Sequence, residues 1–206
     1  MRIAPVGILM PAEPLDRLAA KVAESCKATH NTQLAIASAS AVAAAISSGI
    51  DGKDWRDAIR IAIDAAHEGA RLGEFSAGPD IAARIEWAVD LVRGKSLDEA
   101  LRLIVDLVGT SVASQESVPA AFAVLEVAEG DVWKAATISA NLGGDTDTVG
   151  AIACSIAGAC AGYAALAGLP VDQLHGLDLA EVRKLASDLV DARLALLATA
   201  SARAPS

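Results

Sequence analysis

The chain has 206 residues, which is enough for one domain with a hydrophobic core. Its formal net charge is −9 at pH 7 and it has no run of basic residues, which argues against nucleic acid as a partner because phosphate neutralisation needs clustered Lys and Arg. Apolar residues make up 53% of the chain but aromatic residues only 3%, so Ala, Leu, Ile and Val must build the core. Because Ala is the best helix former, this composition predicts an all-α domain with closely approaching helices.

In the first half of the chain, helices are predicted at residues 15–28, 32–48, 55–72 and 80–94. Pro14 suits the first position of the first helix, and Gly49 suits the end of the second. Either Asp51 or Asp54 can cap the third helix, and Pro79 opens the fourth.

The second half continues the pattern. Residues 96–99, "SLDE", form a capping box in front of a helix that reaches residue 108. Later helices are predicted at residues 118–129, at 132–143 with Asp131 as the cap, and at about 179–200. No run alternates like a strand and no low-complexity linker divides the chain. We therefore expect a single compact domain over residues 1–206, with residues 201–206 as a disordered tail.

Residues 148–168 carry no charge and contain a G-x-x-x-G pattern, so their length would suit a membrane span. However, they are mostly Ala, Gly, Ser and Cys, and Lys, Arg and Trp are missing from their flanks. Small residues suit a helix that is packed on all sides by other helices. We expect a core helix and no membrane partner.

The chain has an odd number of cysteines without C-x-x-C spacing: Cys26, Cys154 and Cys160. This indicates reduced thiols in a cytoplasmic protein. The first residues lack the apolar region and cleavage site of a signal peptide. We therefore expect a cytoplasmic location.

The segment "GGDTDT" at residues 143–148 contains side chains that can bind a metal ion. Asp145 and Asp147 alternate with Thr146 and Thr148, and carboxylates and hydroxyls are hard oxygen ligands for Mg²⁺, Mn²⁺ or Ca²⁺. The preceding glycine pair permits a tight turn, and acids are favoured at the start of a helix. The alternative is that Asp145 or Asp147 only caps the helix.

The whole arrangement resembles the ADP-ribosylglycohydrolase family, which includes the dinitrogenase reductase-activating glycohydrolases. The resemblance rests first on "NLGGDTDTVGAIACSIAGACAG" at residues 141–162. It extends, in the family's order, through "MRIAPVGIL", "ATHNTQLAIASASAVAAAI" and "ESVPAAFAVLEVAEGDVWKAATISA". These blocks cover most of residues 1–165.

That resemblance implies an all-α fold with a binuclear magnesium (sometimes manganese) centre. It implies an enzyme that hydrolyses the glycosidic bond between ADP-ribose and a protein side chain, or a related ADP-ribosyl compound. An ADP-ribosylated protein or an ADP-ribose-type small molecule would be its partner. The matching positions make Asp145, Asp147 and Thr148 metal ligands.

Four more positions are implied to bind substrate: His30, Met1, Arg2 and Gly144. His30 belongs to a Thr-His pair whose histidine lies near the ribose or diphosphate in the family. Without the resemblance, His30 is read as a structural histidine that braces a helix.

The sequence also departs from the family, whose metal centre needs further acids and a glycine-rich loop from an upstream portion. We expect an N-terminally truncated form of the fold with a partial metal site, and the catalytic residue is unknown. Three interpretations stay open. The chain is an incomplete product or has a mis-assigned start, it is half of a split enzyme, or it is a non-catalytic ADP-ribose-binding or protein-interaction module. Uncovered apolar helices would then offer a surface for a partner chain or for self-association.

Overall fold

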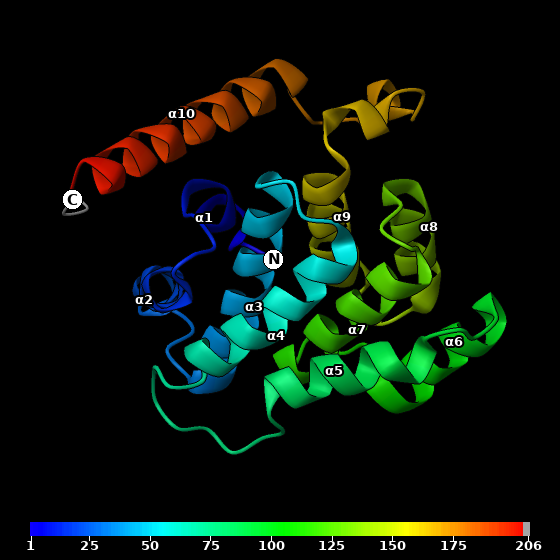
Figure 1. The fold of residues 1–206 in the computed structure, drawn as a ribbon. Helices are drawn as coiled ribbons and strands as arrows, with labels where there is room; N and C mark the ends of the chain where they lie inside the picture. Colours follow the sequence, from blue (N-terminus) through cyan, green and yellow to red (C-terminus); the bar gives the residue numbers. More distant parts are fainter. Residues whose placement is uncertain (204–206) are drawn as a thin grey trace.

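The computed structural model describes residues 1–203, which fold as helices joined by short connections (Figure 1). An isolated bridge between Thr32 and Glu74 is the sole strand-like pairing in this described part. The all-α prediction is therefore confirmed. The helices are α1 (Ala4–Leu9), α2 (Leu15–Cys26), α3 (Gln33–Ile50), α4 (Trp55–Gly69), α5 (Ile81–Val92), α6 (Leu97–Leu103), α7 (Ser114–Val127), α8 (Val132–Leu142), α9 (Thr146–Ala161) and α10 (Leu179–Arg203), with short helical turns η1 (Ile104–Val108), η2 (Tyr163–Leu166) and η3 (Val171–Gln173).

Helix α3 is the centre of the core. It packs against α1, α2, α4, α7 and α9, and most of its side chains are buried. Small residues permit this packing: a Cβ added at Gly7 of α1 would lie 2.7 Å from the Ala43 carbonyl oxygen. One added at Gly69 of α4 would lie 2.6 Å from Ser40 Oγ. The predicted close approach of helices is confirmed.

By length and composition, α3 could also cross a membrane. However, 78% of its apolar window is buried by the rest of the fold. The same composition suits the central helix of a packed domain, and that is the role of α3 here.

The predicted N-caps are largely confirmed. Asp54, rather than Asp51, caps α4 and accepts a hydrogen bond from the Asp57 amide at 2.9 Å. Asp51 instead ends α3 as its C-cap. Pro14 is the residue before α2, not its first residue.

Helix α7 begins at Ser114, earlier than predicted, and Pro119 lies inside it. Proline has no amide hydrogen, so the carbonyl of Gln115, four residues before it, loses its helical partner. The Arg84 side chain of α5 replaces that partner: its Nε donates to the Gln115 carbonyl at 3.1 Å. Another nitrogen of the same guanidinium donates to the Val108 carbonyl at 2.5 Å. Arg84 thus joins α5 to α7 and η1.

The C-terminal part differs from the prediction. Helix α9 ends at Ala161 instead of continuing to residue 168, and it is buried along one face only, since Ala151 and Ala161 are exposed. Helix α10 continues to Arg203, so residues 201–203 belong to a helix rather than to a disordered tail. Residues 204–206, the remainder of that predicted tail, lie outside the described residues.

We expect Arg84→Met to lower the free energy of unfolding by about 1–3 kcal/mol, because it removes the donor from the partly buried carbonyl oxygens of Gln115 and Val108. In a Pro119→Ala background, the backbone at that position gains an amide hydrogen that can donate to the Gln115 carbonyl, so the cost of Arg84→Met should shrink. Urea unfolding of the two single variants and the double variant measures this coupling. If Arg84→Met lowers the free energy of unfolding equally in both backgrounds, Arg84 does not replace the missing amide of Pro119.

Candidate functional site

Three segments that lie far apart in the sequence meet around the start of the chain. Arg2 donates a hydrogen bond of 2.8 Å to Thr29 Oγ1, and His30 Nδ1 lies 2.8 Å from the same hydroxyl. Burial lowers the pKa of the Met1 ammonium, Arg2 lowers it further, and the nearby carboxylate of Asp145 opposes this shift. The structure therefore brings Met1, Arg2 and His30 into one neighbourhood with the start of α9.

Cys26, at the end of α2, belongs to the same neighbourhood. Burial raises the pKa of its thiol, while the positive charges of Arg2 and the Met1 ammonium oppose the change. Arg2, Thr29 and His30 are all exposed, so the polar groups above this buried thiol face solvent.

The turn before α9 places the two acids of the motif. Gly143 and Gly144 have φ angles of 77° and 71°, which a side chain would disfavour. Asp145 is the N-cap residue of α9, and its backbone amide donates to the Thr110 carbonyl at 2.7 Å. Its side chain accepts no capping hydrogen bond, so the capping role considered for Asp145 is absent.

Asp147 and Thr148 follow in the first turn of α9. Asp147 is exposed, whereas Asp145 and Thr148 are half-buried. Among the side chains that the structure describes, neither aspartate forms a hydrogen bond or an ion pair through its carboxylate. Both carboxylates are thus available to a ligand at the positive end of the α9 dipole.

A loop that the sequence analysis overlooked supports this turn. Thr110, which accepts the Asp145 amide, also crowds Gly144, because a Cβ there would collide with the Thr110 carbonyl oxygen. Glu116 of α7 holds the loop by accepting a hydrogen bond of 3.1 Å from the Ser111 amide. Hydrogen bonds from the Ser111 side chain and backbone lower the pKa of Glu116, an effect that burial opposes and Arg84 reinforces.

The oxygen atoms of Asp145, Asp147 and Thr148 are hard donors of the kind that magnesium prefers. In residues 1–203, no group of three His, Cys, Asp or Glu side chains comes together in a metal-binding arrangement. The donor set of this chain therefore fits a hard divalent cation in part. The remaining coordination positions would belong to water or to other ligands.

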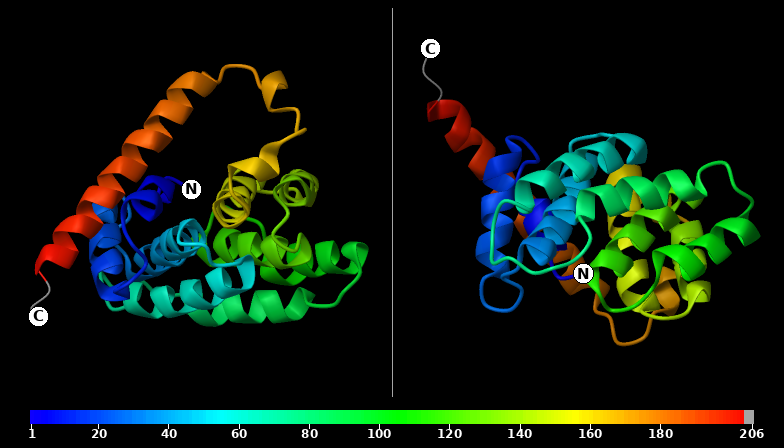
Figure 2. Two further views of the ribbon diagram at one scale, coloured as in Figure 1. Left: turned by 45° about the horizontal axis from the view of Figure 1, so that its top comes forward. Right: turned by 90° about the horizontal axis from the view of Figure 1, so that it is seen from below.

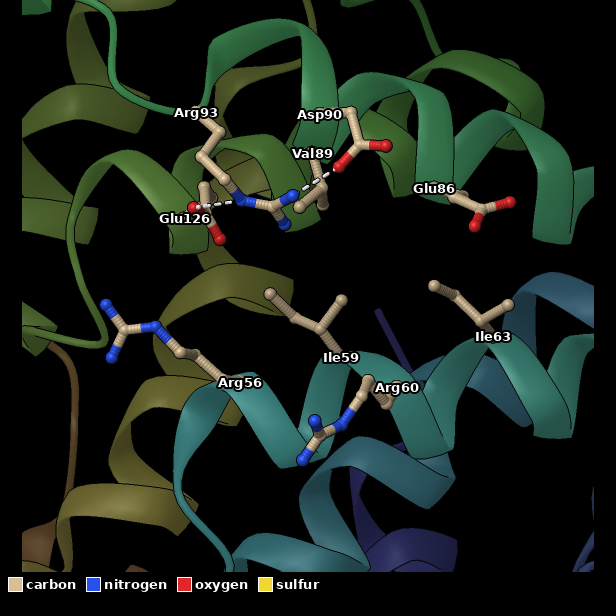
Figure 3. A pocket seen from close by; sticks show the side chains of 9 residues that line it. All are labelled: Arg56, Ile59, Arg60, Ile63, Glu86, Val89, Asp90, Arg93 and Glu126. Atoms are coloured by element: carbon tan, nitrogen blue, oxygen red, sulfur yellow. Dashed lines mark hydrogen bonds and ion pairs between the residues drawn. The ribbon is translucent and has the colours of Figure 1, made fainter.

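A groove of about 330 Å³ lies elsewhere, between α4 and α5 (Figure 3). Much of its charge is already paired: Arg93 binds Asp90 of the same helix and Glu126 of α7, the latter at 3.1 Å. Its floor includes Ile59 and Val89, which are buried. None of the residues proposed from the sequence lines this groove, and we place no active site there.

Comparisons with known proteins identify the family. The family model described as ADP-ribosylglycohydrolase matches residues 1–198. The Escherichia coli (strain K12) protein named "Uncharacterized protein YegU" is 39% identical over 169 residues, which is 81% of this chain and 50% of that protein. The chain thus spans about half the length of this curated relative.

Gly144→Ala should destabilise the fold far more than Gly143→Ala. Both variants force a side chain into a left-handed conformation, which costs about 1–2 kcal/mol. A Cβ at position 143 meets no atom within 4 Å, whereas one at position 144 collides with Thr110. This overlap should lower the free energy of unfolding of Gly144→Ala by about a further 1–3 kcal/mol. Chemical denaturation of both variants tests the contact, and equal losses would show that Thr110 does not constrain the turn.

Proposed function

This chain belongs to the ADP-ribosylglycohydrolase family, and on that premise we propose that it takes part in hydrolysis of a glycosidic bond of ADP-ribose. The bond joins ADP-ribose to a protein side chain or to the remainder of a related ADP-ribosyl compound. The observation that carries this proposal is the meeting of three segments: the Met1 ammonium interacts with the Asp145 carboxylate of the "GGDTDT" turn, and Arg2 binds Thr29 beside His30.

We propose that the reaction depends on Mg²⁺ or Mn²⁺, with Asp145, Asp147 and Thr148 as ligands from this chain. The support is that both carboxylates lack partners among the described side chains and lie at a helix N-terminus. A bound metal of this kind would orient the ribose hydroxyls and activate a water molecule. The binuclear centre of the family needs further acids, which a polypeptide outside this chain would supply.

The substrate side of the site rests on Arg2, Met1, His30 and Gly144. Arg2 donates a hydrogen bond to the neutral Thr29 hydroxyl, and no acid among the described side chains forms an ion pair with it. Its positive charge therefore suits the diphosphate of ADP-ribose. His30 shares the Thr29 hydroxyl and would contact the ribose or diphosphate from the same side. Gly144 would let the substrate approach the backbone closely.

A second function is favoured by the incomplete donor set: a non-catalytic module that binds ADP-ribose or a protein partner. Exposed apolar side chains on α10, among them Leu185 and Leu194, offer a surface for a second chain. The split-enzyme interpretation uses the same surface for a chain that supplies the missing acids. We also propose a cytoplasmic location, which the three free cysteines support.

Calorimetric titration of the chain with ADP-ribose, in the presence and absence of Mg²⁺, tests the proposal. We expect Mg²⁺ to strengthen binding, and we expect Asp145→Asn and Asp147→Asn each to weaken the Mg²⁺-dependent part roughly tenfold or more, because each removes a charged ligand. Asp80→Asn is the matched control, since Asp80 lies at the N-cap of α5 and asparagine also caps well.

Release of ADP-ribose from an ADP-ribosylated protein then separates the two functions. Turnover that requires Mg²⁺ and Asp147 supports the hydrolase, with or without an added chain that completes the site. Tight ADP-ribose binding without any turnover favours the non-catalytic module. Binding that ignores both Mg²⁺ and the two aspartate substitutions would refute the metal assignment.

A further inference from the structure

Arg193 of α10 is the sole charged residue that is nearly fully buried in the part of the chain with described side chains, with 2% of its surface exposed. It lies where α1 and α3 both end. One terminal nitrogen of its guanidinium donates to the carbonyls of Met10 at 2.6 Å and Ile8 at 3.1 Å, and it lies 3.4 Å from that of Gly7. These carbonyls have no partner inside α1, because Gly7 and Ile8 lie in its last turn and Met10 is its C-cap residue.

The other terminal nitrogen binds α3. It lies 3.0 Å from Ser47 Oγ and 2.7 Å from a carboxylate oxygen of Asp51, the C-cap residue of that helix. Ser47 Oγ in turn donates to the Met10 carbonyl at 2.7 Å. The guanidinium therefore faces the negative ends of two helix dipoles as well as a carboxylate, which compensates for its burial.

Around Arg193, α10 is otherwise poorly covered. Figure 2 shows α10 along one edge of the molecule, beside α1, and α1 is its main packing partner among the helices. Large side chains on both sides of Arg193 remain exposed, including Leu185, Val190, Leu194 and Leu196. The attachment of α10 thus depends chiefly on one buried side chain.

The other end of α1 reaches the candidate site. Six residues at about 1.5 Å of rise per residue make α1 about 9 Å long. Met1 and Arg2 directly precede it, where Arg2 binds Thr29 and the Met1 ammonium interacts with the Asp145 carboxylate. Gly7 presses α1 against Ala43 of α3, so the helix cannot tilt toward α3 without a collision. Arg193 holds its C-terminal carbonyls from the side of α10.

We propose that Arg193 is a positioning residue for the candidate site: by binding the end of α1, it fixes the place of Met1 near Asp145 and of Arg2 beside Thr29. The packing of α10 against α1 is then coupled, through α1, to the positions of Met1 and Arg2 at the site. The role of the site in this inference rests on the proposed function, whereas the coupling between α10 and residues 1–10 is a separate physical claim. Release of Arg193 should loosen both ends of α1.

Amide hydrogen exchange of the full chain, measured by mass spectrometry, tests the coupling. In Arg193→Met, we expect exchange in residues 1–10 to accelerate about tenfold or more, because several charge-assisted hydrogen bonds are lost. Exchange in α4 and α5 should not change. Arg183→Met is the matched control: its guanidinium, on the same helix, binds the Tyr163 hydroxyl at 2.6 Å and none of the α1 carbonyls.

Two milder variants keep the test decisive if Arg193→Met unfolds. Arg193→Lys retains the positive charge but has a single terminal nitrogen, which cannot bind both helices as the guanidinium does. Exchange in residues 1–10 should therefore be slower in Arg193→Lys than in Arg193→Met. Asp51→Asn removes only the carboxylate partner and should produce a smaller acceleration in the same residues. Faster exchange confined to α10, with residues 1–10 unchanged in all variants, would overturn the proposal.

Titration with ADP-ribose and Mg²⁺ provides the second readout. If the proposed function holds, Arg193→Met should weaken binding about tenfold, with partial recovery in Arg193→Lys and no change in Arg183→Met. Unchanged affinity in Arg193→Met beside a loosened α1 would overturn the positioning role. Absence of binding by the unsubstituted chain would count against the proposed function, and hydrogen exchange alone would then decide the role of Arg193.

Discussion

The close packing of small residues around α3 is the constraint on which the other contacts depend. Gly7 of α1, Gly49 of α3 and Gly69 of α4 each lie where even a methyl group would collide with a neighbouring helix. This packing sets α1 and α9 beside the same central helix. Since Met1 precedes α1 and Asp145 precedes α9, the first residues and the "GGDTDT" turn meet there. The core geometry and the candidate site are consequences of the same alanine- and glycine-rich composition.

Local signals in the sequence were sufficient for much of the fold. Capping residues such as Asp54 and Asp131 mark helix starts by hydrogen bonds that span three residues, so they can be identified without tertiary information. The same holds for the turn at Gly144, where the glycine pair predicts an unusual backbone. The assignment of Asp145, Asp147 and Thr148 as ligands came from the family resemblance and stays a prediction.

Features set by distant contacts could not be predicted. The helix predicted from residue 118 in fact begins at Ser114, and α7 continues on both sides of Pro119 because Arg84, from another helix, binds the carbonyl that the proline leaves free. Thr110 supports Gly144 across more than thirty residues of sequence, and no periodicity marks such a pair. The uncharged run of α9 suggested burial on all sides, but hydrophobicity alone does not reveal which neighbours are present. The burial of Arg193 is set by its contacts with α1 and α3, which no local pattern around it predicts.

The central claim is that the "GGDTDT" turn, the first residues and the Thr29–His30 pair form one site for a hard divalent cation and its substrate. Nuclear magnetic resonance of the labelled chain with substoichiometric Mn²⁺ tests it most directly, because the paramagnetic ion broadens nearby amides. The account predicts selective broadening at residues 145–149, 1–3 and 29–30, which excess Mg²⁺ reverses. Broadening centred on the acids of the α4–α5 groove, with these segments unaffected, would contradict it.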